Sequence, residues 1–311
     1  MSDLATIEKI EGVSMKYLLA FIVAILLFST FAEAERSLPY TVSTQWLSEH
    51  LQDKNLVVLQ VAFSRREYEY AHIPGARFLW FEGLAPSTPE LSTEMPTVEE
   101  GKHILEDLGV TNDSKIVVVF NGGSVTIGTR MVLALTYFGF GERTALLDGG
   151  LSLWKSEGKP ISRETPLTKR STLTLETHPK VVTYAEWVKA HLTSPDVAIV
   201  DARSKTFYDG NGGGIARQGH IKGARSIPYT TIVDSTNKLK SVSELQKIFT
   251  DAGIAKGTTV VTYCHVGQQA TLVYYAARML GYDAIVYDGC FEDWNVRDES
   301  FPVEKSEDPK K

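Results

Sequence analysis

Cys264 stands where the sequence favours a reactive thiol. It follows the apolar run TVVTY at residues 259–263 and opens a short loop, which a helical pattern follows. Backbone N–H groups of such a loop point at the sulfur, and the helix N-terminus adds partial positive charge, so both favour the thiolate. The thiolate is the nucleophilic form of cysteine. The loop alone leaves a second interpretation open, a small buried residue at a strand end.

The stretch around Cys264 repeats an earlier part of the chain. AHIPGAR at 71–77 returns as GHIKGAR at 219–225, IVVVFN at 116–121 as TVVTYC at 259–264, and LLDGGLSLW at 146–154 as VYDGCFEDW at 286–294. With two further matches, the offsets stay between 140 and 148 residues and keep their order. We therefore predict a duplicated domain of about 120 residues rather than a solenoid of short repeats. In the first copy, Asn121 takes the position of Cys264.

Each copy alternates short β-branched runs with helical patterns. In the second copy, residues 197–200, 259–263 and 284–287 predict strands, while 243–251 and 271–280 predict helices. Apolar strands alternating with helices are typical of an α/β fold with a parallel sheet covered on both faces. Residues 160–180 are polar, hold three prolines and show no period. We expect domains at 40–160 and 181–305, joined by an extended linker at 161–180.

Composition narrows the class of protein. The 311 residues include 32 Lys and Arg against 38 Asp and Glu, a net charge of −6, and 43% are hydrophobic. This balance is typical of a chain that buries a core, and its acidic sign disfavours a nucleic-acid partner. The chain has two cysteines, Cys264 and Cys290. Two cysteines exclude a disulfide scaffold and a four-thiolate zinc site.

Residues 1–34 read as an N-terminal extension and an export signal. Lys16 precedes an almost uninterrupted apolar run at 17–31, which ends at the small-x-small sequence Ala32-Glu33-Ala34. That order is typical of a secretory signal peptide cleaved after Ala34, and the run is short for a membrane span. We expect a periplasmic or secreted mature protein with no membrane segment. An uncleaved N-terminal anchor is the alternative.

Four boxes of the second copy together resemble the two-domain rhodanese (thiosulfate sulfurtransferase) family. They are DAR at 201–203, GHIKGA at 219–224, YCHVGQQA at 263–270 and LGYDAIVYDGCFEDW at 280–294, and the resemblance covers residues 40–300. It implies two tandem rhodanese-like domains, an inactive first one and a catalytic second one. It also implies that Cys264 carries a sulfane sulfur as a persulfide from a donor to cyanide or a thiol, without a cofactor or metal. The family precedent implies a monomer.

The resemblance favours thiosulfate as the donor. The family's 3-mercaptopyruvate enzymes carry a serine two residues after the cysteine and an aspartate in the first domain, positions that here read Val266 and Gln60. The match to thiosulfate enzymes is also imperfect, because basic residues of their loop are replaced. We therefore predict weak thiosulfate affinity that improves towards pH 6 as His265 becomes cationic. The implied substrate-binding residues are His265, Val266, Gly267, Gln268, Gln269 and Arg203.

The roles of several other residues are each open to two interpretations. Asp201 and Arg203 read as a buried scaffold pair more than as catalytic groups. Cys290 takes the place of Gly150 of the first copy, either as a redox partner of Cys264 or as a small residue in a serine-like position. His72 and His220 recur in matching boxes, one of them in the inactive half, which favours a structural role.

Three other functions compete with thiosulfate turnover. The first is 3-mercaptopyruvate sulfur transfer, and the second is a periplasmic persulfide carrier or binding module that does not turn thiosulfate over. The third is a phosphatase of the same fold, which would need an arginine at the position of Ala270. The alanine there argues against it.

Overall fold

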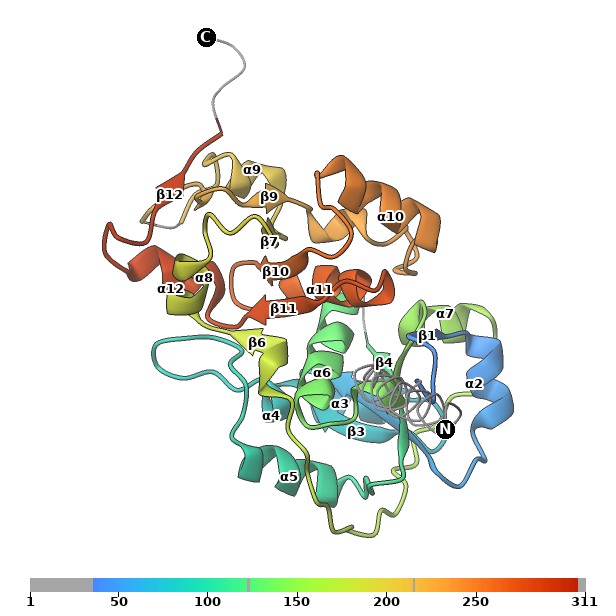
Figure 1. Cartoon of the computed structure of the whole chain (residues 1–311). Coiled ribbons are helices and arrows are strands. Elements are labelled where there is room, and N and C mark those ends of the chain that lie inside the picture. Colours follow the sequence, from blue (N-terminus) through green and yellow to red (C-terminus); the bar gives the residue numbers. More distant parts are fainter. Residues whose placement is uncertain (1–35, 122–123, 215, 307–311) are drawn as a thin grey trace, which may run out of the picture. The chain divides into compact units, whose positions relative to one another are not determined.

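Each half of the chain folds around one five-stranded parallel sheet. In the computed structural model, which describes residues 36–121, 124–214 and 216–306, the strand orders are β1-β5-β4-β2-β3 and β6-β11-β10-β7-β9. The two orders match strand for strand, which confirms the predicted α/β duplication (Figure 1). Residues 37–311 form one compact unit. The predicted signal peptide lies outside the described residues.

The elements of the first half follow the expected alternation. They are β1 (Thr41–Val42), α2 (Thr44–His50), β2 (Leu56–Ala62), α3 (Arg65–Tyr70), β3 (Arg77–Trp80), α4 (Phe81–Leu84), α5 (Val98–Asp107), β4 (Lys115–Phe120), α6 (Val125–Tyr137), the 3-10 turn η1 (Gly141–Arg143), β5 (Thr144–Leu147) and α7 (Gly150–Ser156).

The second half repeats this series with one addition. Its elements are η2 (Pro179–Val181), β6 (Val182–Thr183), α8 (Ala185–Ala190), β7 (Val197–Asp201), α9 (Lys205–Tyr208), β8 (His220–Ile221), β9 (Arg225–Ser226), η3 (Tyr229–Thr231), α10 (Val242–Asp251), β10 (Thr259–Tyr263), α11 (Ala270–Met279), β11 (Ala284–Tyr287), α12 (Cys290–Val296) and β12 (Val303–Glu304). The addition is the antiparallel pair β12-β8.

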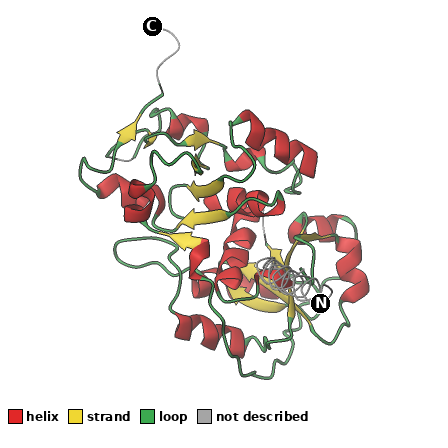
Figure 2. Ribbon diagram, in the orientation of Figure 1, coloured by secondary structure: helices red, strands yellow, loops and turns green. Residues whose placement is uncertain are grey.

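Both faces of each sheet are buried, as the sequence predicts. Along β2, Val57 and Leu59 belong to one hydrophobic cluster, while Val58 between them belongs to another. Neighbouring residues of a strand point to opposite faces, so apolar packing covers both. Figure 2 shows the strands of each sheet among the helices that surround them. In β10, Val260 and Val261 are both fully buried. Because both faces of these strands are buried, their sequences are nearly continuous apolar runs.

The start of one helix in each half is set by a capping box. Thr97 is the N-cap of α5. Its side chain accepts the Glu100 N–H, and the Glu100 carboxylate accepts the Thr97 N–H in return. Ser241 and Glu244 repeat the arrangement at α10. Such reciprocal caps satisfy two N–H groups that a helix end would leave unpaired.

The two halves share one hydrophobic core, in which α6 packs against α11. Two polar contacts join α6 to α11 and to the loop before it. Thr129 Oγ1 lies 2.8 Å from Thr271 Oγ1, and Gln268 Nε2 donates to Thr126 Oγ1 at 2.9 Å. The segment at 161–180 packs along the first half, with Leu173 buried and its N–H bonded to Glu106. In the described part of the chain, no helix is long and apolar enough to cross a membrane.

Candidate active site

Cys264 lies at the carboxyl edge of the second sheet, directly after its central strand. β10 pairs with β7 on one side and β11 on the other, so its end is fixed by hydrogen bonds from both neighbours. The loop at 264–269 then leads into α11. Cys264 is fully buried, with an exposure of 0%. The structure thus confirms the predicted position of Cys264, between the end of a strand and the start of a helix.

The surroundings of Cys264 stabilise a thiolate. Burial by itself raises the pKa of the Cys264 thiol, but hydrogen bonds from the Cys290 thiol and from the N–H groups of Ala270, Val266 and Gly267 outweigh it. Together they lower the pKa to about 6. At neutral pH the sulfur is therefore mostly ionised, which is the form that attacks electrophiles.

The thiosulfate reaction should report this pKa. We expect kcat/KM for thiosulfate to rise with pH up to about 6 and to stay level above about 7, because the thiolate fraction is then complete. The measurement is a pH profile between pH 5 and 9. The same profile on a His265→Gln variant removes the imidazole as a second titrating group. A rate still rising through pH 8.5 would indicate an ordinary thiol and contradict this assignment.

Gly267 shapes the loop around the sulfur. Its φ is +82°, a left-handed conformation that favours glycine. A methyl group at this position would lie 3.1 Å from Thr93 Oγ1 and 3.2 Å from the Asp288 carbonyl oxygen. The loop, the first half and the segment after β11 therefore meet around this glycine.

A Gly267→Ala variant should lose both stability and sulfur transfer. The expected cost is about 1–3 kcal/mol, from backbone strain and from the two close contacts. Gly257→Ala is a matched control, since Gly257 has φ +81° and no atom within 4 Å of an added methyl. Urea unfolding and thiocyanate formation should both be worse for Gly267→Ala. Equal losses in the two variants would show that the contacts at Gly267 carry no weight.

The other predicted loop residues point in different directions. The ring of His265 packs edge-on against Phe207 at 4.4 Å between centroids. Burial and, secondarily, the Arg203 charge lower the pKa of His265 below its ordinary value. This direction disfavours a cationic His265, and the gain of thiosulfate affinity towards pH 6 stays a prediction. Gln268 reaches across to Thr126, and Gln269 precedes α11 with its side-chain oxygen buried and without a hydrogen-bond partner.

The contacts of Arg203 indicate a structural role. Its guanidinium is fully buried and binds the Asp201 carboxylate, with Nη2 at 2.6 Å from Oδ2 and 2.7 Å from the Gly219 carbonyl oxygen. Tyr263 donates its hydroxyl to the same carboxylate at 2.7 Å. These contacts bind the end of β7 to the end of β10. They favour the scaffold interpretation of the Asp201–Arg203 pair over direct donor binding.

The first half contributes residues that sequence reasoning missed. Arg130 on α6 is fully buried and pairs with Asp288 at 2.6 Å, and the Met95 N–H donates to the other oxygen of the same carboxylate at 2.9 Å. A methyl group at Gly267 would lie 3.5 Å from Arg130 Nη1, so this charge lies beside the loop. Burial, helped by Asp288, raises the pKa of neighbouring Glu94 to about 7. No sequence signal near residue 130 indicated this contact.

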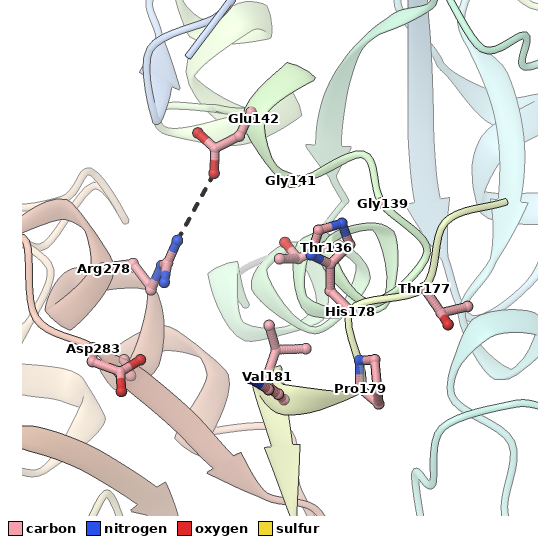
Figure 3. A pocket seen from close by; sticks show the side chains of 12 residues that line it. Thr136, Gly139, Gly141, Glu142, Thr177, His178, Pro179, Val181, Arg278 and Asp283 are labelled. Carbon is pink, nitrogen blue, oxygen red and sulfur yellow. Dashed lines mark ion pairs between the residues drawn. The ribbon is translucent and has the colours of Figure 1, made fainter. Parts of the chain in front are cut away.

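Two cavities lie away from Cys264. One of about 480 Å³ lies between the C-terminal ends of α6 and α11, where Glu142 pairs with Arg278 (Figure 3). Its wall includes Ala284, which pairs with Val260 at the start of β10 and so marks the opposite edge of the sheet from Cys264. A second cavity of about 290 Å³ adjoins Asn121 in the first half.

A thiolate in a loop of N–H donors at the edge of a parallel sheet defines a nucleophilic-cysteine protein of the α/β class. The profile of the rhodanese-like domain matches residues 43–157 and 184–297. The chain belongs to the rhodanese-like family, with two tandem domains.

Several relatives resemble the chain over nearly the full length of both. It is 29% identical to the thiosulfate sulfurtransferase of Azotobacter vinelandii, over 86% of this chain and 98% of the relative. It is 27% identical to the 3-mercaptopyruvate sulfurtransferase of Escherichia coli K12, over 86% and 99%. The crystal structure of SseA, a 3-mercaptopyruvate sulfurtransferase from Escherichia coli, superposes with a TM-score of 0.74 at 26% identity, covering 81% of this chain and 99% of that one.

Proposed function

We propose that this chain is a sulfurtransferase that moves a sulfane sulfur from thiosulfate to cyanide or a thiol through a persulfide on Cys264. The Cys264 thiolate attacks the outer sulfur of thiosulfate, the S–S bond of thiosulfate breaks and sulfite leaves. The acceptor then attacks the outer sulfur of the persulfide and returns the thiolate. The observation that carries the proposal is the fully buried Cys264 sulfur among hydrogen-bond donors. Such donors stabilise the anions of both steps, and neither step calls for a metal or cofactor.

Thiosulfate is favoured over 3-mercaptopyruvate by residues of the first half. Gln60 donates to the Ala71 carbonyl and accepts the Ile73 N–H, so it is occupied in holding the loop at 71–77. His72 is buried and stacked on Tyr68, with both ring nitrogens within 3.0 Å of backbone carbonyl oxygens. Neither residue is free to assist a bound ketoacid. Val266 supplies no hydroxyl either.

The test compares the two donors directly. The chain from Glu35 onward is assayed for thiocyanate formation from cyanide with thiosulfate and with 3-mercaptopyruvate in parallel. We expect turnover with thiosulfate. Turnover with 3-mercaptopyruvate alone would overturn the choice of donor while leaving Cys264 as the carrier.

A persulfide carrier is the second candidate, favoured by the complete burial of Cys264. A relative 28% identical, over 81% of this chain and 92% of its own length, is named sulfur carrier protein TtuD in Thermus thermophilus. A carrier would accept one sulfur atom on Cys264. With cyanide, it would form thiocyanate no faster than free thiols do. The steady-state rate of thiocyanate formation therefore separates the two candidates.

We also propose that the protein is exported and acts as a monomer. The apolar run at 17–31 and the Ala32-Glu33-Ala34 site support export with cleavage after Ala34. Expression of the full chain, followed by cell fractionation and N-terminal sequencing, tests the first point. An intact N-terminus on a membrane-bound product would contradict it. Light scattering on the chain from Glu35 onward tests the second.

A further inference from the structure

The two cysteines of the chain, 26 residues apart in sequence, meet in the active site. Cys290 opens α12 and is fully buried, like Cys264. The Cys264 N–H points at Cys290 Sγ, with nitrogen and sulfur 3.1 Å apart. The N–H groups of Phe291 and Glu292 donate to the carbonyls of Cys264 and His265, each at 3.0 Å. The start of α12 is therefore hydrogen-bonded along the nucleophile loop, and the Cys290 sulfur is held beside the backbone of Cys264.

The backbone of Cys290 is unusual for a residue with a side chain. Its φ is +51°, and Gly150 at the same place in the first half has φ +58°. Glycine adopts this conformation freely, whereas other residues are strained in it. A small space-filling residue does not require this strain, since the first half manages with glycine. The presence of a side chain in this strained conformation therefore points to a use for its sulfur.

The protonation of the pair suits a reaction between them. The Cys290 thiol has one proton and two acceptors, the Tyr287 carbonyl oxygen at 3.0 Å and the Cys264 sulfur. Burial and then the hydrogen bond and charge of Cys264 raise the pKa of Cys290 well above its ordinary value. Cys264 is thus the thiolate that accepts sulfur, and Cys290 is a neutral thiol beside it that still holds a proton.

We propose that Cys290 resolves the Cys264 persulfide, releasing the transferred sulfur as hydrosulfide and leaving a Cys264–Cys290 disulfide. Cys290 Sγ attacks Cys264 Sγ, and the bond between Cys264 Sγ and the outer sulfur breaks. The proton of the Cys290 thiol goes to the departing sulfur, so a persulfide anion and a thiol become a disulfide and HS⁻. The two cysteine sulfurs are oxidised and the outer sulfur is reduced. The inference rests on the proposed function for the supply of the persulfide.

The disulfide returns to the dithiol by exchange with a reducing thiol. Over the whole cycle, thiosulfate and two thiols give sulfite, hydrosulfide and one disulfide. This is a reductive release of sulfide, distinct from transfer to cyanide. The buried site favours it, because bulky external thiols reach Cys264 less readily than the thiol already beside it.

The experiment follows the fate of sulfur on Cys264 without an external acceptor. The wild type, Cys290→Ser and Cys264→Ser are treated anaerobically with thiosulfate in one arm and with inorganic polysulfide in the other, then desalted and followed by intact mass, peptide mapping and hydrosulfide assay. In the wild type we expect the added sulfur to disappear, with one hydrosulfide released and a linked Cys264–Cys290 peptide formed. Cys290→Ser should keep the sulfur and release none.

The two arms separate the possible failures. If thiosulfate adds no sulfur but the polysulfide arm of the wild type gives the linked peptide, the resolution step stands and the proposed donor fails. If the linked peptide is absent from both arms, or if the wild type keeps its sulfur as long as Cys290→Ser does, the resolution step is wrong. Treatment of the linked form with dithiothreitol should restore both free thiols.

Discussion

A Cys264→Ser variant should lose thiocyanate formation from thiosulfate by at least about a thousandfold, because it removes the nucleophile that carries the sulfur. A serine hydroxyl is scarcely ionised in the same N–H environment and cannot form a persulfide. The measurement is steady-state thiocyanate formation, with background corrected by a protein-free reaction.

The variant's stability distinguishes chemistry from misfolding. Cys264 is buried, and serine is of similar size, so the urea midpoint should change little. Lys247→Met is a control away from the loop, because it breaks only an exposed pair of Lys247 with Asp251 at 2.7 Å. Activity of Cys264→Ser within about tenfold of the wild type would contradict the role of Cys264.

An Arg130→Met variant should be destabilised by about 3–5 kcal/mol, because it leaves the buried Asp288 carboxylate without its charge partner. Arg130 and Asp288 are 0% and 1% exposed, and their 2.6 Å contact joins the two halves. Since Asp288 lies directly before Gly289 and Cys290, the active-site segment should also loosen. The measurement is the free energy of unfolding in urea, together with thiocyanate formation.

Two further variants make the Arg130 result specific. Arg130→Met combined with Asp288→Asn removes both charges and should recover part of the lost stability. Arg65→Met breaks an exposed pair, Arg65 with Glu69 at 3.7 Å, and should cost less than about 1 kcal/mol. A loss no larger for Arg130→Met than for Arg65→Met would show that the buried pair does not hold the halves together.

Most of the fold could be predicted from the repeated sequence motifs. Because strand runs and helices recur at nearly constant offsets, the two parallel sheets and the place of Cys264 at a strand end could be predicted from local pattern. The Asp201–Arg203 pair could also be predicted, since the two residues are neighbours in sequence and end a buried strand. Each of these features depends on short-range order.

The contacts that complete the site depend on long-range packing. Arg130 lies in the apolar helix α6, and its partner is 158 residues away, so the local pattern gives no indication of the pair. The distance between Cys264 and Cys290 is set by the turn after β11 and by hydrogen bonds from α12 to the loop. The lowered pKa of His265 could not be predicted, because burial of the ring against Phe207 is invisible in the sequence.

We propose above all that Cys264 carries the transferred sulfur. The most direct measurement mixes the chain from Glu35 onward with thiosulfate, quenches within the first turnover and maps the peptides without reductant. We expect one additional sulfur atom on the Cys264 peptide, removed by cyanide as one equivalent of thiocyanate. An unmodified Cys264 peptide from protein that turns thiosulfate over would contradict it.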